Sequence, residues 1–79
     1  MRRFVLYRLV DHSDVSGIGP VADGVKFPDD SLAVRWRGEN ACTAVWDNEE
    51  KLLKVHGHNG DTEIRYIDPI YPLEEHIIY

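Results

Sequence analysis

Short stretches in which hydrophobic and polar residues alternate recur along the chain and predict five β-strands. β-Branched and aromatic residues are concentrated in these stretches, and clusters of glycine, proline, asparagine and aspartate separate them, as is typical of a β-rich domain. The predicted strands cover Phe4–Val10, Val21–Phe27, Ser31–Gly38, Cys42–Trp46 and Thr62–Asp68.

The second and third predicted strands form a hairpin whose buried side follows from the two-residue period of a strand. Gly24 interrupts the first arm, where a glycine usually marks a bulge or a sharp bend that helps a sheet to curl into a barrel. The residues expected to face the core are Val21, Val25 and Phe27 on one arm and Leu32, Val34 and Trp36 on the other.

The first predicted strand is apolar on both faces, with Val5 and Tyr7 on one and Phe4 and Leu6 on the other. We therefore expect both faces to be covered, one of them by residues 69–79. This final segment has two prolines near its start and ends on Ile-Ile-Tyr. It is predicted to be an extended arm that docks on its own domain or on a partner chain.

The segment Asp47–Gly57 has the marks of a short helix. Asp47 is expected to cap its start, with Glu50 as the capping-box partner, and Gly57 is expected to end it in a left-handed conformation. The following Asn59-Gly60 pair predicts a tight turn into the last strand.

This order of elements matches a small SH3-like five-stranded barrel over residues 1–68, with one short helix before the last strand and a C-terminal arm over 69–79. A partly open sheet with one helix packed against it is the alternative. Closure is favoured because it removes the exposed edges of the sheet.

Composition and charge narrow the class of protein. The chain has 79 residues and a net charge of −5, which disfavours wrapping a nucleic-acid backbone, although several basic residues fall on the predicted strands. The single cysteine, Cys42, lies in an apolar run and is expected to be buried in a reducing compartment. No membrane-spanning segment or signal peptide is indicated, so a cytoplasmic location is predicted.

His56, His58 and Asp61 are the candidate metal ligands. Helix geometry turns His56 toward the apolar face of its helix, while His58 lies beyond the glycine, so the two side chains should diverge. We therefore interpret the histidines as part of a helix end and a turn, and expect no metal and no other cofactor. No nucleophile or dinucleotide motif is present, and no enzyme activity is predicted.

The sequence favours binding over catalysis. An exposed tryptophan beside arginine is a common pairing at protein-binding hot spots. The predicted contact surface comprises the long loop before the second strand together with Asp14, Arg35, Arg37, Trp46 and Arg65. The alternative for Trp46 is a place in the core, and the alternative functions are nucleic-acid binding, a homo-oligomer joined through the arm, and a metal-dependent enzyme.

Four motifs between Asp14 and Asp68 carry a resemblance to a known family: DVSG, VADGVKFPDDSLAVRW, TAVW and VHGHNGDTEIRYID. They resemble short proteins of unknown function encoded in actinobacterial and haloarchaeal genomes and in the viruses and prophages of those hosts. The sequence departs from that pattern at Asp30, where the family has a turn glycine, at Cys42, and at Tyr66 in place of tryptophan. The resemblance implies a viral or mobile-element origin and contact with a host component, and it supplies no catalytic residues.

Overall fold

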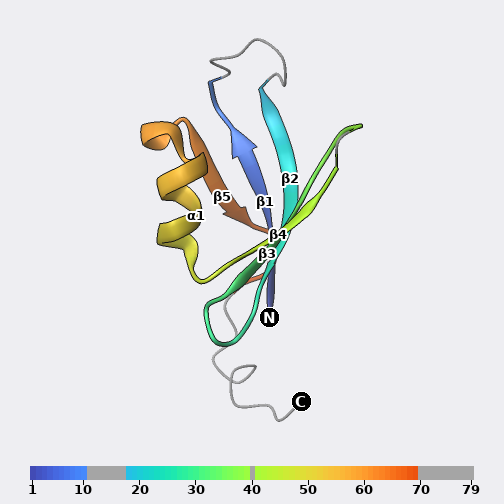
Figure 1. Ribbon diagram of the computed structural model, residues 1–79, viewed down its shortest axis with the longest axis vertical. Coiled ribbons are helices and arrows are strands. Elements are labelled where there is room, and N and C mark those ends of the chain that lie inside the picture. Colours follow the sequence, from blue (N-terminus) through green and yellow to red (C-terminus); the bar gives the residue numbers. More distant parts are fainter. Residues whose placement is uncertain (11–17, 40, 70–79) are drawn as a thin grey trace.

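One five-stranded antiparallel sheet and one short helix make up the computed structural model, which describes residues 1–10, 18–39 and 41–69, with only the backbone of His58 (Figure 1). The strand order is β4-β3-β2-β1-β5. The elements are β1 (Arg2–Arg8), β2 (Gly19–Lys26), β3 (Leu32–Trp36), β4 (Thr43–Trp46), α1 (Glu49–His56), the 3-10 turn η1 (His58–Gly60) and β5 (Thr62–Tyr66).

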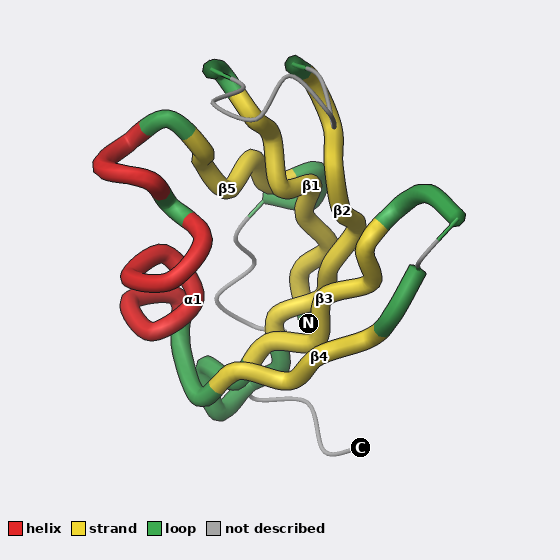
Figure 2. The backbone as a smooth tube through the Cα atoms, turned by 45° about the horizontal axis from the view of Figure 1, so that its top comes forward, coloured by secondary structure: helices red, strands yellow, loops and turns green. Residues whose placement is uncertain are grey.

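The sheet is strongly twisted but is not closed, so the predicted barrel is wrong and the open sheet with one helix is correct. β4 and β5 lie at opposite edges of the sheet and do not pair with each other (Figure 2). α1 contacts both edge strands, and the Thr62 N–H at the start of β5 donates to the Gly57 carbonyl at 3.0 Å. The helix and the turn after it therefore occupy the space through which β4 would have to approach β5.

The hydrophobic core lies between α1 and one face of the sheet, which we call the inner face. Its fully buried side chains come from three strands and the helix: Phe4, Leu6, Ala22, Leu32, Val34 and Leu52. Each large aliphatic or aromatic side chain removed from water in this way contributes about 1.5–3 kcal/mol. This burial fixes which side of every strand faces the helix.

In β2, the face prediction fails because the small residues point inward. Ala22 is directly opposite Leu6 and Gly24 is opposite Phe4 across the β1–β2 ladder. A Cβ at Gly24 would collide with the Phe4 ring, so the glycine makes room for the largest core side chain. Val25, expected inside, is half-buried on the opposite face.

Of the remaining predictions for this hairpin, some are wrong and one is correct. The register is regular at Gly24, and its irregularity lies between Leu6 and Tyr7, so the predicted bulge is misplaced. Phe27 is exposed rather than buried. Val21 packs against the margin of the core, as predicted.

The turn between β2 and β3 requires a particular backbone conformation at its third residue, Asp30. The Asp30 N–H donates to the Phe27 carbonyl at 3.0 Å, and the Phe27 N–H donates to the Ser31 carbonyl at 2.8 Å. Asp30 has a φ of 72°, in the left-handed region that a three-residue hairpin loop requires at this position. Glycine adopts this conformation without strain and aspartate tolerates it.

The helix forms where the sequence predicts it, but both caps differ. Asn48, not Asp47, is the N-cap, and its side chain accepts a hydrogen bond from the Lys51 N–H at 2.9 Å. Gly57 is right-handed with a φ of −76°. The left-handed residue of this connection is Asn59, with a φ of 56°, so the predicted Asn59-Gly60 turn is present.

Cys42 is exposed, contrary to prediction, because it precedes the short edge strand and has no layer above it among the described residues. The predicted arm, apart from Pro69, lies outside the described residues, as does most of the loop before β2. Within the described part of the chain, no helix is long and apolar enough to cross a membrane.

Candidate functional site

The face of the sheet that is turned away from α1, which we call the outer face, carries a regular array of side chains. Residues paired across antiparallel strands point to the same side, so the register gives the array directly. One row of paired positions crosses all five strands and consists of Thr43, Arg35, Asp23, Val5 and Arg65. The next row consists of Val45, Ala33, Val25 and Arg3.

Three residues of the second row, Val45, Ala33 and Val25, form an apolar stripe. Val45 is 73% exposed, while Ala33 and Val25 are half-buried by their neighbours in the sheet. A shallow hollow of about 250 Å³ lies beside the stripe and is bounded on its polar side by Arg35 and Asp23. No element of residues 1–10, 18–39 or 41–69 covers this stripe, and Val45 at its end is exposed.

Most guanidinium groups on this face are held by carboxylates. Arg65 lies over the Tyr7 ring, 3.8 Å from its centroid, and its Nε donates to Glu63 at 2.6 Å. Arg37 binds Asp23 through two hydrogen bonds of 2.7 and 2.9 Å. The Arg37 guanidinium lowers the pKa of the Asp23 carboxyl, mainly by donating these hydrogen bonds.

Arg35 is different from these arginines. Its Nη1 donates to the Thr43 hydroxyl at 3.2 Å, and no carboxylate of the described residues pairs with it. The side chain is exposed and lies beside the apolar stripe. This part of the outer face therefore offers a cationic hydrogen-bond donor next to hydrophobic surface, the combination that often anchors a protein partner.

The structure separates the residues that the sequence grouped into one contact surface. Arg35 and Arg65 lie on the outer face, and Arg37 lies at its margin through its bond to Asp23. Trp46 lies on the inner face, opposite Leu32, so it does not join the arginines. The fifth predicted residue, Asp14, lies outside the described residues.

Trp46 belongs to an aromatic cluster that seals the core beside α1. The His56 imidazole lies between the two tryptophans, with ring centroids 4.8 Å from Trp36 and 5.5 Å from Trp46. His56 thus points to the apolar face of its helix, as predicted. Trp46 is half-buried and packs against the core, which agrees with the alternative expectation of a place in the core better than with an exposed contact beside the arginines.

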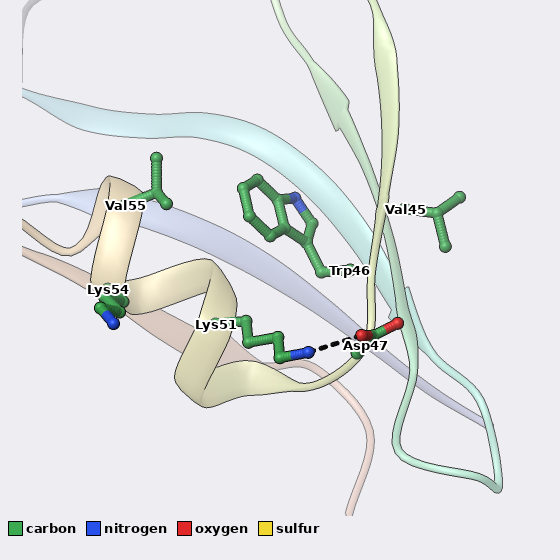
Figure 3. A pocket seen from close by; sticks show the side chains of 6 residues that line it. All are labelled: Val45, Trp46, Asp47, Lys51, Lys54 and Val55. Atoms are coloured by element: carbon green, nitrogen blue, oxygen red, sulfur yellow. Dashed lines mark hydrogen bonds and ion pairs between the residues drawn. The ribbon is translucent and has the colours of Figure 1, made fainter.

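A groove bordered by Trp46 runs between the end of β4 and α1 (Figure 3). Its volume is about 340 Å³, and Trp46 and Val55 give it an apolar wall while Lys51 and Lys54 line its polar side. The Lys51 ammonium is held by Asp47 at 2.7 Å. Figure 3 shows the Val45 side chain directed away from the helix, while the Trp46 indole lies between β4 and α1.

The candidate metal ligands do not form a described site. His56 is packed between aromatic rings, and the His58 side chain lies outside what the structure describes. Asp61 precedes β5, and its carbonyl accepts a hydrogen bond from the Leu9 N–H at 2.7 Å. Within the described residues, no group of three or more His, Cys, Asp or Glu side chains is placed to hold a metal ion.

Sequence reasoning missed the apolar stripe. The alternation in CTAVW assigns Val45 and Trp46 to opposite faces, but it does not say which face is inside. The helix that follows Trp46 decides it, because a short connection places α1 over the face that carries the tryptophan.

No curated protein and no solved structure matches the chain significantly. The family model of the Acb5 phage protein matches residues 1–68, which include all five strands and the helix. The chain belongs to the Acb5 phage protein family.

Proposed function

We propose that this phage protein is a small protein-interaction module that binds a protein of the infected host cell through its outer face. The observation that carries the proposal is the apolar stripe that ends at Val45, 73% exposed, beside the guanidinium of Arg35, which no carboxylate among the described residues binds. The proposed activity is binding alone, in the host cytoplasm, and requires neither catalysis nor a cofactor. The resemblance of the motifs favours an actinobacterial or haloarchaeal host.

The charge distribution favours a protein over a nucleic acid. Arg37 and Arg65 are each bound by a carboxylate on the same face, and the chain carries a net charge of −5. A phosphate backbone needs several uncompensated cations in a row. On the part of this face that the structure describes, Arg35 is the guanidinium without a carboxylate, and its apolar surroundings fit a single carboxylate set in a hydrophobic environment instead.

These contacts define the chemistry of the partner surface. It should place an aliphatic or aromatic side chain against Val45 and Ala33, and a carboxylate within bidentate reach of Arg35. The Arg65–Tyr7 stack lies in the same face and supplies a second, rigid anchor of the kind enriched at hot spots.

The test is a comparative capture experiment from lysate of the phage's host, quantified by mass spectrometry, followed by calorimetry with each captured protein. Arg35→Glu and Val45→Asp each alter the outer face, and we expect each to weaken binding at least about tenfold, because each places a negative charge where the partner's carboxylate or apolar group would lie. Val55→Asp is the matched control: this valine is also exposed, at 56%, but lies on α1 at the groove.

A host protein that is lost with both outer-face variants and retained with Val55→Asp supports the proposal. Capture that is equal for the unmodified chain, Arg35→Glu and Val45→Asp would exclude this face as the binding surface. Binding that falls steeply with salt and extends to oligonucleotides would favour the nucleic-acid alternative.

A further inference from the structure

The two edges of the sheet are not equivalent. At the β5 edge, the N–H of Thr62 points away from β1 and is bound by the Gly57 carbonyl at 3.0 Å. The segment that contains α1 and η1 thus covers the start of this edge, and Glu63 and Arg65 add charges along it. Covered and charged edges resist pairing with another strand.

At the β4 edge, two residues direct their backbone groups away from the other four strands. The Trp36 N–H donates to the Cys42 carbonyl at 2.9 Å, which makes these two residues a hydrogen-bonded pair. Because such pairs alternate along an antiparallel ladder, Ala44 directs its N–H and C=O toward β3 as well. Thr43 and Val45 consequently direct theirs to the opposite side, where no described strand lies.

Within the described residues, the β4 edge also lacks the features by which proteins protect an edge. The stretch from Ala41 to Trp46 contains no charged residue and no proline, and its register with β3 is regular. Cys42, Thr43 and Val45 are all exposed. The apolar wall of the groove at Trp46 adjoins the same strand.

We propose that β4 pairs with β4 of a second copy of this chain, antiparallel, around a two-fold axis at Ala44. Each Thr43 then lies opposite Val45 of the second copy, and both residues use the backbone groups that face outward. The two Ala44 residues form the close pair at the axis. The two sheets become one continuous sheet, and the interface is isologous, because both copies use the same strand.

The side chains near the axis are self-complementary. The strand brings no like charges together, and each exposed Val45 packs against the Thr43 methyl group of the second copy. The residue after β4, Asp47, becomes a diagonal neighbour of Thr43 in the second copy, at about 7–8 Å.

Proline at position 45 is the sharpest test, because its effect on the two sides of β4 differs. Val45→Pro removes an N–H that faces the open edge and leaves the bonds to β3 intact. We expect the unmodified chain to sediment as a dimer at about 100 µM, and Val45→Pro to sediment as a folded monomer with an unchanged circular dichroism spectrum. Val45→Thr retains the N–H and should remain dimeric.

Disulfide trapping tests the register. In a Cys42→Ser background, Ala44→Cys should form a covalent dimer on mild oxidation, because the two residues at the axis lie within disulfide distance. Val45→Cys in the same background should not, because the axis displaces the two copies of residue 45 along the strand. A chain that is monomeric at about 100 µM overturns the proposal, as does efficient trapping by Val45→Cys without trapping by Ala44→Cys.

The dimer does not depend on the proposed host partner. A monomeric chain that still loses its partner with Arg35→Glu would leave the proposed function in place while removing the dimer. A chain that is dimeric but captures no host protein would keep the dimer and remove the proposed function.

Discussion

The two faces of the sheet use similar residues for opposite purposes. Val34 and Val45 lie on neighbouring strands, yet Val34 is fully buried on the inner face and Val45 is 73% exposed on the outer face. The inner face meets a helix and contains fully buried side chains from β1, β2 and β3. The difference teaches that stability and recognition are separated in this small domain by the alternation of the strands, so that each can be altered without the other.

Removing the main helix contact to the core should have the largest effect. Leu52→Ala leaves a cavity at the only fully buried side chain of α1 in the described residues, and we expect the free energy of unfolding to fall by about 3 kcal/mol. Val55→Ala, one helical turn away and exposed, should change it by less than about 0.5 kcal/mol. Urea denaturation measures both, and equal losses would show that the core does not depend on the contact of Leu52 with the inner face.

The second largest effect should come from enlarging a side chain on the inner face, compared with the same kind of change on the outer face. Gly24→Ala pushes a methyl group into the Phe4 ring and is expected to cost about 2 kcal/mol. Ala33→Val enlarges an outer-face residue on the adjacent strand and should stay within about 0.5 kcal/mol. Combining Gly24→Ala with Phe4→Leu should recover part of the loss, because the two changes act on one contact.

Removing a buried hydroxyl should raise the free energy of unfolding rather than lower it. Thr62 is 3% exposed, and its Oγ1 has no hydrogen-bond partner in the described structure. Thr62→Val keeps the shape and removes the unsatisfied group, so we expect the free energy of unfolding to rise by about 1 kcal/mol. Thr62→Ala also removes the methyl group and should destabilise. A melting temperature for Thr62→Val below that of the unmodified chain would refute the prediction.

The smallest effect should come from an exposed ion pair beside the outer face. Two hydrogen bonds from the Arg3 guanidinium, of 2.8 and 3.0 Å, and one from its backbone N–H hold the Asp68 pKa at about 2, below its usual 3.8. The stabilisation that this lowered pKa provides is present above about pH 4 and is lost as the pH falls toward 2.

Asp68→Asn should flatten the dependence of the melting temperature on pH in this interval. Carboxyl NMR titration measures the pKa directly, and Arg3→Ala should return it toward 3.8. An Asp68 pKa that Arg3→Ala leaves unchanged would show that the ion pair does not cause the shift.

The sequence predicted the number, order and type of the elements because the strands alternate clearly and the helix has polar residues at its start. It did not predict the inward face of β2. Gly24 and Ala22 look like interruptions of an apolar pattern, but they are small because Phe4 and Leu6, far from them in the sequence, fill the space above them. The pattern along one strand gives the size of each residue but not the size of the residue that it contacts on the neighbouring strand.

The candidate site was predicted only in part for a related reason. Arg35 and Arg65 were assigned correctly to strands, but their common face depends on the register between strands, which no local pattern determines. Closure could not be predicted for the same reason. It depends on where the twisted sheet places its two edge strands, and β4 and β5 lie at opposite ends of the order β4-β3-β2-β1-β5.

The aromatic cluster at the end of α1 makes tryptophan fluorescence an intrinsic probe of this protein. Both tryptophans contact the imidazole of His56, and neither lies on the outer face. Their emission will therefore report the detachment of the helix during unfolding, while a partner that docks on the opposite side of the sheet leaves the fluorescence unchanged.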